Sequence, residues 1–180
     1  MARIGGTLIG TALKLVNSSG ENNEGRLFSF GPAAGTNRSL GALSTEGTSL
    51  AFGVALINKA GKTIDHVTVA CTAEIWRGAS RNQDVFPFFY GVDGDGINDA
   101  NFLTNKAMLP YPDLDLKAPD IGKNKAEVDG KAADNRAGLT ATLANLQWPP
   151  DGMLFLAWRA MDIPGKGAGL AIDDLSIKAN

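Results

Sequence analysis

The sequence predicts an all-β protein, a two-sheet antiparallel β-sandwich of jelly-roll type. Its apolar stretches alternate with a period of two, as strands do, and none keeps a helical period along its length. Segments rich in Gly, Asn, Asp and Pro separate these stretches, which is typical of sandwiches and jelly rolls. The 180 residues are 44% hydrophobic, enough for one core, so we expect a single domain over residues 1–180.

The longest strand is expected over Thr63–Trp76, where apolar and mixed residues alternate. Its apolar face carries Val67, Val69, Cys71, Ala73 and Ile75. The preceding stretch, Ser49–Asn58, is apolar on both faces, as in an interior strand. The short link Lys59–Lys62 contains a glycine, so we expect these two strands to pair as a hairpin.

The remaining strands are expected where shorter alternating stretches occur. They are Arg26–Phe30, Val85–Tyr90, Leu139–Leu146, Met153–Met161 and Gly169–Lys178. The last of them changes phase, because Leu170 and Ile172 share one parity whereas Leu175 and Ile177 share the other. One extra residue in a strand produces such a change, so we predict a β-bulge at Asp173-Asp174. The bulge turns an aspartate out of the regular pleat, where the carboxylate needs a partner.

Composition excludes several classes of function. A net charge of −2 gives no general attraction to nucleic acid, so no nucleic-acid partner is expected. No stretch approaches the ~18 apolar residues of a membrane-spanning helix. The single Cys and single His exclude an intramolecular disulfide and the common zinc constellations.

Asp173 and Asp174 are the candidate metal ligands. Calcium takes oxygen ligands, which carboxylates and backbone carbonyls near a bulge can supply, so a structural Ca²⁺ is the one cofactor considered. The alternative is that one aspartate caps backbone N–H groups and the other is solvated. A second acidic segment, Asp93–Asp99, does not fit an EF-hand because Phe102 stands where the bidentate Glu belongs. It is interpreted as a surface turn.

Four residues are candidate ligand contacts. Glu74 and Trp76 share the more polar face near the end of the long strand, followed by Arg77. An aromatic ring stacks on the C–H face of a sugar and a carboxylate accepts its hydroxyls, so this pair suggests a saccharide platform, to which Arg136 adds a further contact. The alternative is that Trp76 lies in the core and Glu74 pairs with an arginine.

Catalytic motifs are weak. The glycine-rich Gly165–Gly169 leads into a strand and lacks the strand–loop–helix context of a phosphate loop. His66 and Cys71 have opposite parity on one strand and point apart, so they do not form a nucleophile and base. Paired carboxylates for glycoside hydrolysis stay open, since their separation in space is invisible in a sequence.

A family resemblance rests on an ordered series of short motifs that covers most of the chain from Arg26 onward. The motifs are RLFSFG at 26–31, NRSLG at 37–41, FG at 52–53 with NKAG at 58–61, AEIWR at 73–77, VDG at 128–130 with ADNR at 133–136, and GLAIDD at 169–174. Together they resemble a bacterial exported jelly-roll-like domain found in PEP-CTERM-type surface proteins. The closing GLAIDD strand is also similar to carbohydrate-binding jelly rolls and to MAM adhesion domains.

The resemblance implies export to the medium or the cell surface and a binding or scaffold role. In the similar binding modules the aspartate at the position of Asp173 often helps to hold calcium. The chain departs from the family in lacking the aromatic-rich segment before Arg26 and a sorting helix after Asn180, and in carrying Arg159 where the family has Asp. Because the segment before Arg26 is short, an N-terminal strand could be missing or could come from another chain. A missing strand would leave one edge of the sheet unpaired.

The sequence therefore favours a non-catalytic extracellular binding module for glycan. Two alternatives stay open: a structural or adhesive surface protein that assembles through its sheet edges as a homo-oligomer or by strand sharing, and a polysaccharide-active enzyme. The enzyme hypothesis needs His66, Tyr90, Tyr111 and Glu74 to converge.

Overall fold

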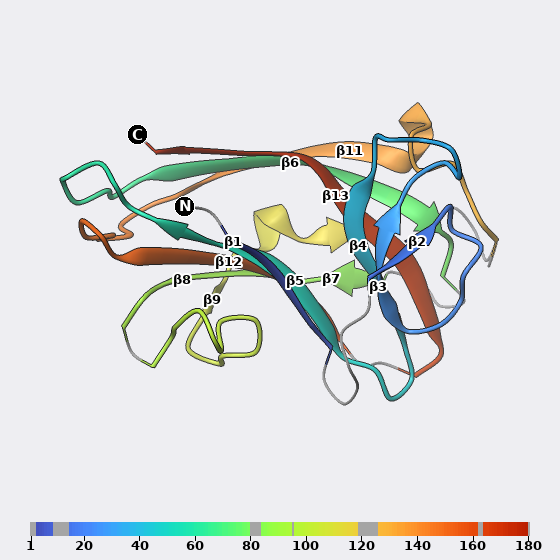
Figure 1. The fold of residues 1–180 in the computed structure, drawn as a ribbon, viewed down its shortest axis with the longest axis horizontal. Coiled ribbons are helices and arrows are strands. Elements are labelled where there is room, and N and C mark those ends of the chain that lie inside the picture. Colours follow the sequence, from blue (N-terminus) through green and yellow to red (C-terminus); the bar gives the residue numbers. More distant parts are fainter. Residues whose placement is uncertain are drawn as a thin grey trace.

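The fold is that of a computed structural model, which describes residues 3–8, 15–79, 84–94, 96–118, 126–161 and 164–179, the first range by its backbone alone. Two sheets face each other, as Figure 1 shows in edge view. One sheet, here sheet A, has the order β1-β5-β12-β8-β9, and the other, sheet B, has the order β11-β6-β13-β4-β3-β2. Their strands pair antiparallel except for β2, which runs parallel to β3.

The strand bounds are as follows. Sheet A contains β1 (Arg3–Leu8), β5 (Leu50–Ile57), β8 (Phe88–Val92), β9 (Leu109–Pro110) and β12 (Met153–Ala160). Sheet B contains β2 (Val16–Ser18), β3 (Arg26–Phe30), β4 (Ser39–Thr45), β6 (Val67–Arg77), β11 (Arg136–Leu143) and β13 (Lys166–Ala179). A short pair joins β7 (Val85–Phe86) to β10 (Leu116–Lys117), and single 3₁₀ turns lie at Pro112–Leu114 and Ala133–Asn135.

The connections make this sandwich a jelly roll. From β4 to β8 the long strands alternate between the sheets, and β11, β12 and β13 alternate again. The last two strands then enter the middle of the sheets, β12 between β5 and β8, and β13 between β4 and β6. The fold class expected from the sequence is confirmed.

The prediction that β5 and β6 pair as a hairpin is wrong. Both strands form where expected, but β5 pairs with β1 and β12, and β6 pairs with β11 and β13. The link between them crosses from one sheet to the other; in it Gly61 takes a φ of 70°. The side-chain amide of Asn58 and the backbone N–H of Ile64 both donate hydrogen bonds to the backbone carbonyl of Trp148. These bonds hold the crossover against the segment just before β12.

The predicted bulge is confirmed. Asp173 pairs with Thr72 and Ser176 with Ala70, so β13 has one residue more than β6 between these two pairs. Asp174 takes a φ of 51°, a left-handed backbone conformation that Asp tolerates better than most residues. The phase change lets Leu175 and Ile177 pack against the same core as Leu170 and Ile172, which lie on the other side of the bulge.

Two hydrophobic clusters lie on opposite faces of sheet B. The main core between the sheets is centred on Trp158, whose ring centroid lies 4.9 Å from that of Phe88 and 5.9 Å from that of Phe52. On the outer face, where sheet B curls at the β2–β3–β4 end, a second cluster forms from Phe28, Phe30, Leu43, Trp76 and Ala171. The second cluster explains why both faces of β6 are buried at its end.

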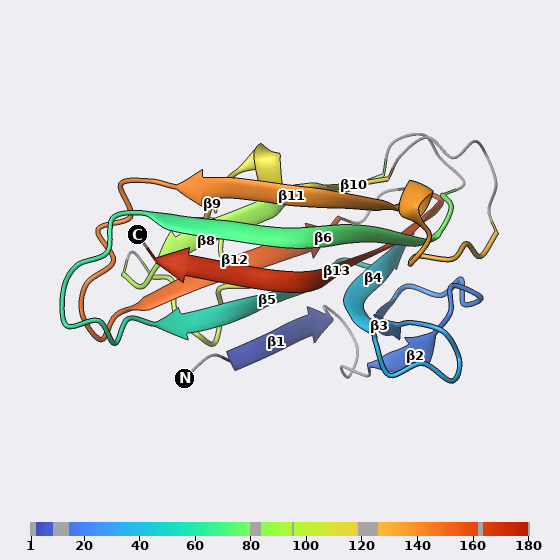
Figure 2. The same ribbon diagram turned by 90° about the horizontal axis from the view of Figure 1, so that it is seen from above.

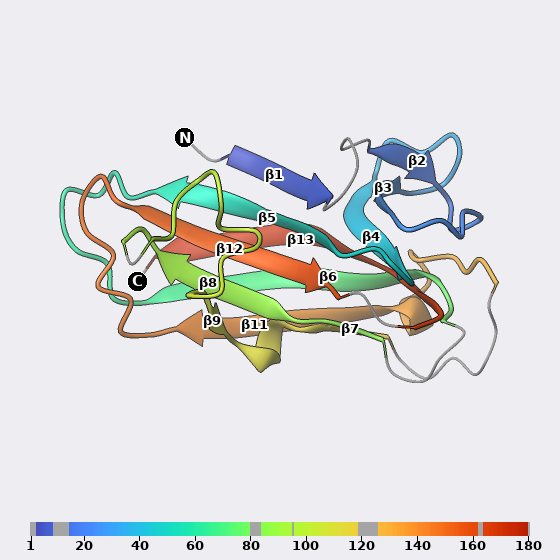
Figure 3. The same cartoon turned by 90° about the horizontal axis from the view of Figure 1, so that it is seen from below.

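The outer face of sheet A is partly covered by the chain between β8 and β9. Figure 3 shows this segment running across β5 and β12. Its buried residues pack on Phe155 and Ala157 of β12; they are Ile97, Phe102, Leu103 and Met108. Gly94 and Gly96 take positive φ, in line with the surface turn expected there. No helix in the described residues is long and apolar enough to span a membrane.

Candidate ligand groove and its charged rim

A charged cluster lies where β6, β11 and β13 run side by side, and it includes three of the residues singled out in the sequence. Glu74, Arg136 and Asp173 come from neighbouring positions on these strands, since Arg136 and Ala171 both pair with Glu74. Lys131 reaches into the cluster from the segment before β11. Its ammonium Nζ lies 3.0 Å from Glu74 Oε1 and 2.7 Å from Asp173 Oδ2.

Glu74 is fully occupied by its partners. Its side chain is 0% exposed. Oε1 accepts a hydrogen bond from Lys131 and lies 3.2 Å from Arg136 Nε, which is not aligned for a hydrogen bond. Oε2 accepts hydrogen bonds from the hydroxyl of Ser39 and from Trp76 Nε1, the latter at 3.0 Å. Because the side chain is completely buried, this carboxylate is not accessible to a sugar hydroxyl or to a substrate.

Electrostatics favour the ionised forms of Asp173 and Lys131. Burial alone would raise the pKa of Asp173, but the ammonium of Lys131, the backbone N–H of Asp174 and the guanidinium of Arg136 lower it below its ordinary value. Burial alone would lower the pKa of Lys131, but hydrogen bonds and charges from Asp173 and Glu74 raise it. Lys131 is therefore an ammonium at neutral pH and does not serve as a general base.

Trp76 is enclosed rather than presented to solvent. It is 1% exposed, with its ring stacked on Phe30 at a centroid distance of 5.9 Å. Gly130 lies against the ring, and a Cβ there would come within 2.3 Å of Trp76 Cε2. The backbone of Val128 also donates a hydrogen bond to the carbonyl of Trp76. Segment 128–131 therefore covers the indole, and only a residue without a Cβ fits at position 130.

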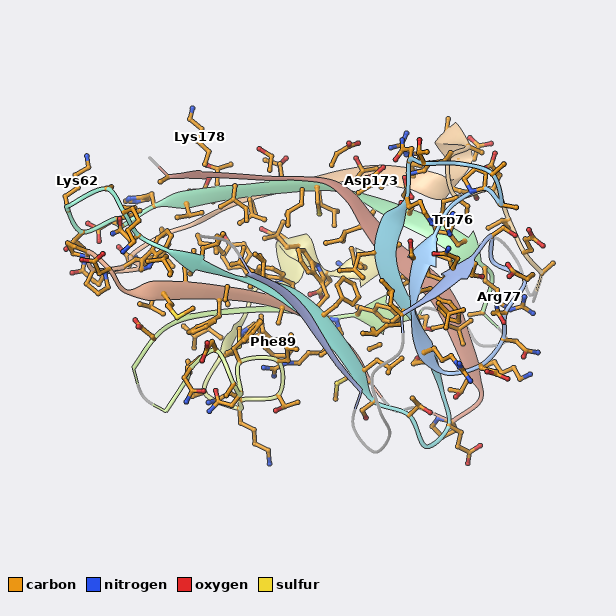
Figure 4. All side chains as sticks on the ribbon, in the orientation of Figure 1. Lys62, Trp76, Arg77, Phe89, Asp173 and Lys178 are labelled. Carbon is orange, nitrogen blue, oxygen red and sulfur yellow. The ribbon has the colours of Figure 1, made fainter. Side chains whose placement is uncertain are left out.

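In the structure Glu74 and Trp76 do not form an exposed platform. Trp76 belongs to a hydrophobic cluster and Glu74 pairs with Arg136, as in the alternative drawn from the sequence, and also with Lys131. Arg77 lies apart from Glu74: its Nη1 donates to the carbonyls of Gly20 and Glu21 at 2.8 and 3.2 Å, which ties the segment after β2 to the end of β6. Figure 4 shows Trp76, Arg77 and Asp173 in the half of the molecule that lies away from Lys62.

Calcium at Asp173 and Asp174 stays a prediction. The described residues contain no group of three or more His, Cys, Asp or Glu side chains arranged for a metal ion. Asp173 already holds the Lys131 ammonium, whereas the Asp174 side chain is 70% exposed and lies 3.5 Å from Arg136 Nη2. A calcium ion at this pair would compete with two cations of the protein itself.

A groove opens beside the bulge, on the side where sheet B ends early. β4 pairs with β13 only as far as Ile172, so beyond it β13 has β6 as its one neighbour among the described strands. In the view of Figure 2, β5 and then β1 lie beyond the free edge of β13 on this side. The groove has a volume of about 210 Å³ and is lined by Arg38, Leu40, Phe52, Gly53, Val54, Trp158, Ile172, Asp173, Asp174 and Leu175.

The groove combines apolar walls with a charged rim. Leu40, Val54 and Leu175 form part of the wall, and the carboxylate of Asp174 is exposed at the rim. The Arg38 guanidinium is held by Ser29, whose hydroxyl accepts a hydrogen bond from Arg38 Nε–H at 2.8 Å. Such a lining suits a small ligand with apolar C–H faces and hydroxyls, and its volume lies below the ~300–1,000 Å³ of drug-sized sites.

The four residues that the polysaccharide-active enzyme hypothesis requires do not all lie at one site. The rings of Tyr90 and Tyr111 lie 6.0 Å apart, and the Tyr111 hydroxyl donates to the carbonyl of Thr142 on β11. Glu74 on β6 pairs with Arg136, at the other end of β11. Arg136 is six residues from Thr142, which puts Glu74 about 20 Å from the Tyr111 hydroxyl at ~3.4 Å per residue. His66 is exposed just before β6 begins, at the end remote from Glu74.

Sequence reasoning missed the residues that organise this site. Lys131 stands in the loop before β11, and nothing in its neighbourhood signals an ion pair with a strand 42 positions further on. Arg38 and Leu40 were noted as parts of a motif only. They line the groove together with residues of β5 because the chain crosses from one sheet to the other, which the sequence pattern does not specify.

No known protein family matches the sequence, and no curated protein matches it. Solved structures with a similar fold include the carbohydrate-binding module CBM4, at 16% identity over 88% of this chain and 91% of that one, with a TM-score of 0.41. The module CBM61, solved with β-1,4-galactotriose, has 12% identity over 99% of this chain and 88% of that one (TM-score 0.42). A family 11 xylanase from Neocallimastix patriciarum has 10% identity over 99% and 100% (TM-score 0.41). These likenesses are too distant to assign a function.

Proposed function

We propose that the chain is a non-catalytic, exported binding module for glycan, and that one sugar unit of the glycan occupies the groove beside the bulge. The observation that supports this most is the lining of the groove, where Leu40, Val54 and Leu175 stand next to the charged Arg38 and Asp174. A sugar ring has apolar C–H faces and a belt of hydroxyls, so it complements both parts of such a lining.

The charged cluster supports a binding role over a catalytic one. The carboxylate of Glu74 is completely buried among its partners, and Lys131 is held as an ammonium by the carboxylates that contact it. Neither group is free to exchange a proton with a substrate. The cluster instead fixes the Asp173 side of the groove rim.

Affinity electrophoresis against a panel of neutral and acidic polysaccharides tests the proposal. We expect at least one polysaccharide to retard the protein, and Asp174→Asn to weaken that retardation several-fold. Asparagine tolerates the positive φ at this position, so the variant changes the charge with little effect on the backbone. Asp113→Asn, at another exposed carboxylate on the surface, is the matched control. Absence of retardation by every polysaccharide would rule the proposal out.

Assembly through a sheet edge is the second candidate. Beyond the bulge, residues 176–179 of β13 pair with β6 alone among the described strands, which leaves an edge open to a further strand. The same edge carries the bulge and the charged Asp174 and Lys178, devices that blunt edge pairing, so we rank assembly below glycan binding. Light scattering at rising protein concentration separates the two: a monomer throughout argues against assembly.

A further inference from the structure

A second pocket lies on the outer face of sheet A, away from the groove. It opens between the segment that crosses β5 and β12 and the adjoining ends of those two strands. Its volume is about 240 Å³, and its lining consists of Ser49, Leu50, Ala51, Leu103, Thr104, Lys106, Arg159, Ala160 and Met161. Trp158, the residue before Arg159, points instead into the main core, because successive side chains of a strand face opposite sides.

Arg159 is a partly buried cation without a carboxylate partner in the described part of the chain. Its Nη2 donates to the carbonyl oxygens of Asn105 at 2.7 Å and Phe102 at 3.1 Å. Its Nε is buried and has no hydrogen-bond acceptor. The guanidinium carbon lies 4.1 Å from the centroid of the Phe89 ring, which holds the planar group against the sheet.

This arrangement leaves a positive charge that an anion would compensate. Carbonyl oxygens and an aromatic face supply only partial negative charge, whereas a desolvated cation is stabilised most by a full one. Burial lowers the pKa of Arg159, in accord with the missing anion. Lys106 adds a second positive charge to the lining, and the lining contains no acidic residue.

The rest of the pocket is apolar. Ala51 and Leu103, which belong to the cluster on the outer face of sheet A, form its walls, Leu50 and Ala160 of the main core complete the lining, and Met161, 52% exposed, stands at its edge. A ligand that fits must therefore carry its negative charge at one end of a hydrocarbon body. We propose that this pocket binds a small carboxylic acid with an apolar body, whose carboxylate pairs with Arg159 and Lys106 and whose body lies against Leu103 and Met161.

Titration of the ¹⁵N-labelled protein with octanoate, followed by NMR, tests this site. We expect saturable shifts of backbone amides at 103–106 and 159–161. Octanol has the same body without the charge and should bind at least tenfold more weakly, because a hydrogen bond to a charged group is roughly twice as strong as a neutral one and an ion pair is added to it. Galacturonate has the charge without the apolar body and should also bind at least tenfold more weakly.

Variants separate the site from a general effect of charge. Lys106→Glu alters an exposed side chain and should weaken octanoate binding several-fold without loss of the fold. Lys62→Glu is the control: Lys62 lies in the β5–β6 link, at the end of β5 opposite to the pocket, and its replacement should leave octanoate binding unchanged. Arg159→Met should weaken binding at least tenfold; Arg159→Lys, which keeps the charge, should recover part of the loss.

The outcome is independent of glycan binding, because the two sites share no residue. Asp174→Asn should leave octanoate binding unchanged. The inference is overturned if octanoate does not bind, if it shifts amides elsewhere, or if octanol or Lys106→Glu gives the affinity measured for octanoate with the wild type.

Discussion

The ammonium of Lys131 lies 3.0 Å from Glu74 Oε1, although the two residues are 57 positions apart in the chain. Glu74 is completely buried, and Lys131 also holds Asp173, so one lysine bridges carboxylates from β6 and β13. This contact fastens segment 128–131 over the Trp76 ring and sets the position of the groove rim.

Replacing Lys131 should destabilise the fold. Lys131→Met leaves Glu74 buried with only Arg136 as a nearby cation, and breaking a buried ion pair in this way costs about 3 kcal/mol. Urea unfolding gives the change in the free energy of unfolding. The double variant Glu74→Gln/Lys131→Met removes both charges and should be less destabilised than the two single effects add up to. Strict additivity would show that the pair is not coupled.

The stabilisation from Lys131 should depend on pH at both extremes. The pKa of Asp173 is lowered, so its contribution is present above its ordinary pKa of about 3.9 and is lost as the pH falls through the lower folded value. The pKa of Lys131 is raised, so its contribution is present below its ordinary pKa of about 10.4 and is lost as the pH rises through the higher folded value.

The difference in unfolding free energy between wild type and Lys131→Met should therefore be largest between about pH 5 and 9 and shrink on both sides. Denaturant titrations at a series of pH values measure it. A difference that stays constant down to about pH 2 would contradict the ion-pair assignment.

Gly130 should not tolerate a side chain. A Cβ at this position would lie 2.3 Å from the Trp76 ring, so Gly130→Ala must push segment 128–131 away from the sheet. We expect a loss of about 2 kcal/mol or more and a red shift of tryptophan emission as the indole gains solvent. Gly138→Ala, on β11, is the matched control, because a Cβ there meets no atom within 4 Å. Equal melting temperatures for the two variants would contradict this packing.

Cys71 should be unreactive in the folded protein. It is buried on the core face of β6, and burial raises the pKa of its thiol to about 11. The thiolate, which is the reactive form, is therefore scarce at pH 8. A colorimetric thiol reagent should label Cys71 quickly in denaturant and only at the rate of unfolding without it. Rapid labelling of the native protein would show that this part of the core is open.

The calcium hypothesis makes its own prediction. Calcium at Asp173 and Asp174 must displace the Lys131 ammonium from Asp173 Oδ2, so Lys131→Met should bind calcium more tightly than the wild type. Isothermal titration with calcium chloride compares the two proteins, and magnesium chloride serves as the control for ionic strength. No binding by either protein would dispose of the site.

The sequence pattern reveals features that are local to one strand. The bulge at Asp173-Asp174 is visible because it reverses the parity of Leu170 and Ile172 relative to Leu175 and Ile177, and no other part of the chain is needed to see it. The apolar alternation of β6 is visible for the same reason. Both predictions are confirmed.

Features set by the partner strands are not visible in the same way. The link after β5 has the composition of a hairpin turn, but in a jelly roll the next strand belongs to the other sheet, so β6 pairs elsewhere. Trp76 has the parity of an exposed platform, but Phe30 on β3 and segment 128–131, more than 50 positions later, bury it. The groove is equally non-local, because it exists where β4 stops pairing with β13.

The central place of β13 in sheet B has a consequence for synthesis on the ribosome. β4 and β6 leave the exit tunnel long before β13, and they cannot close the gap between them without it. Until β13 arrives, two apolar strand edges face an empty position of the width of one strand, and the nascent chain is exposed to mispairing. We therefore expect sheet B to close only when β13 inserts between β4 and β6, so this closing step comes after the earlier strands have formed.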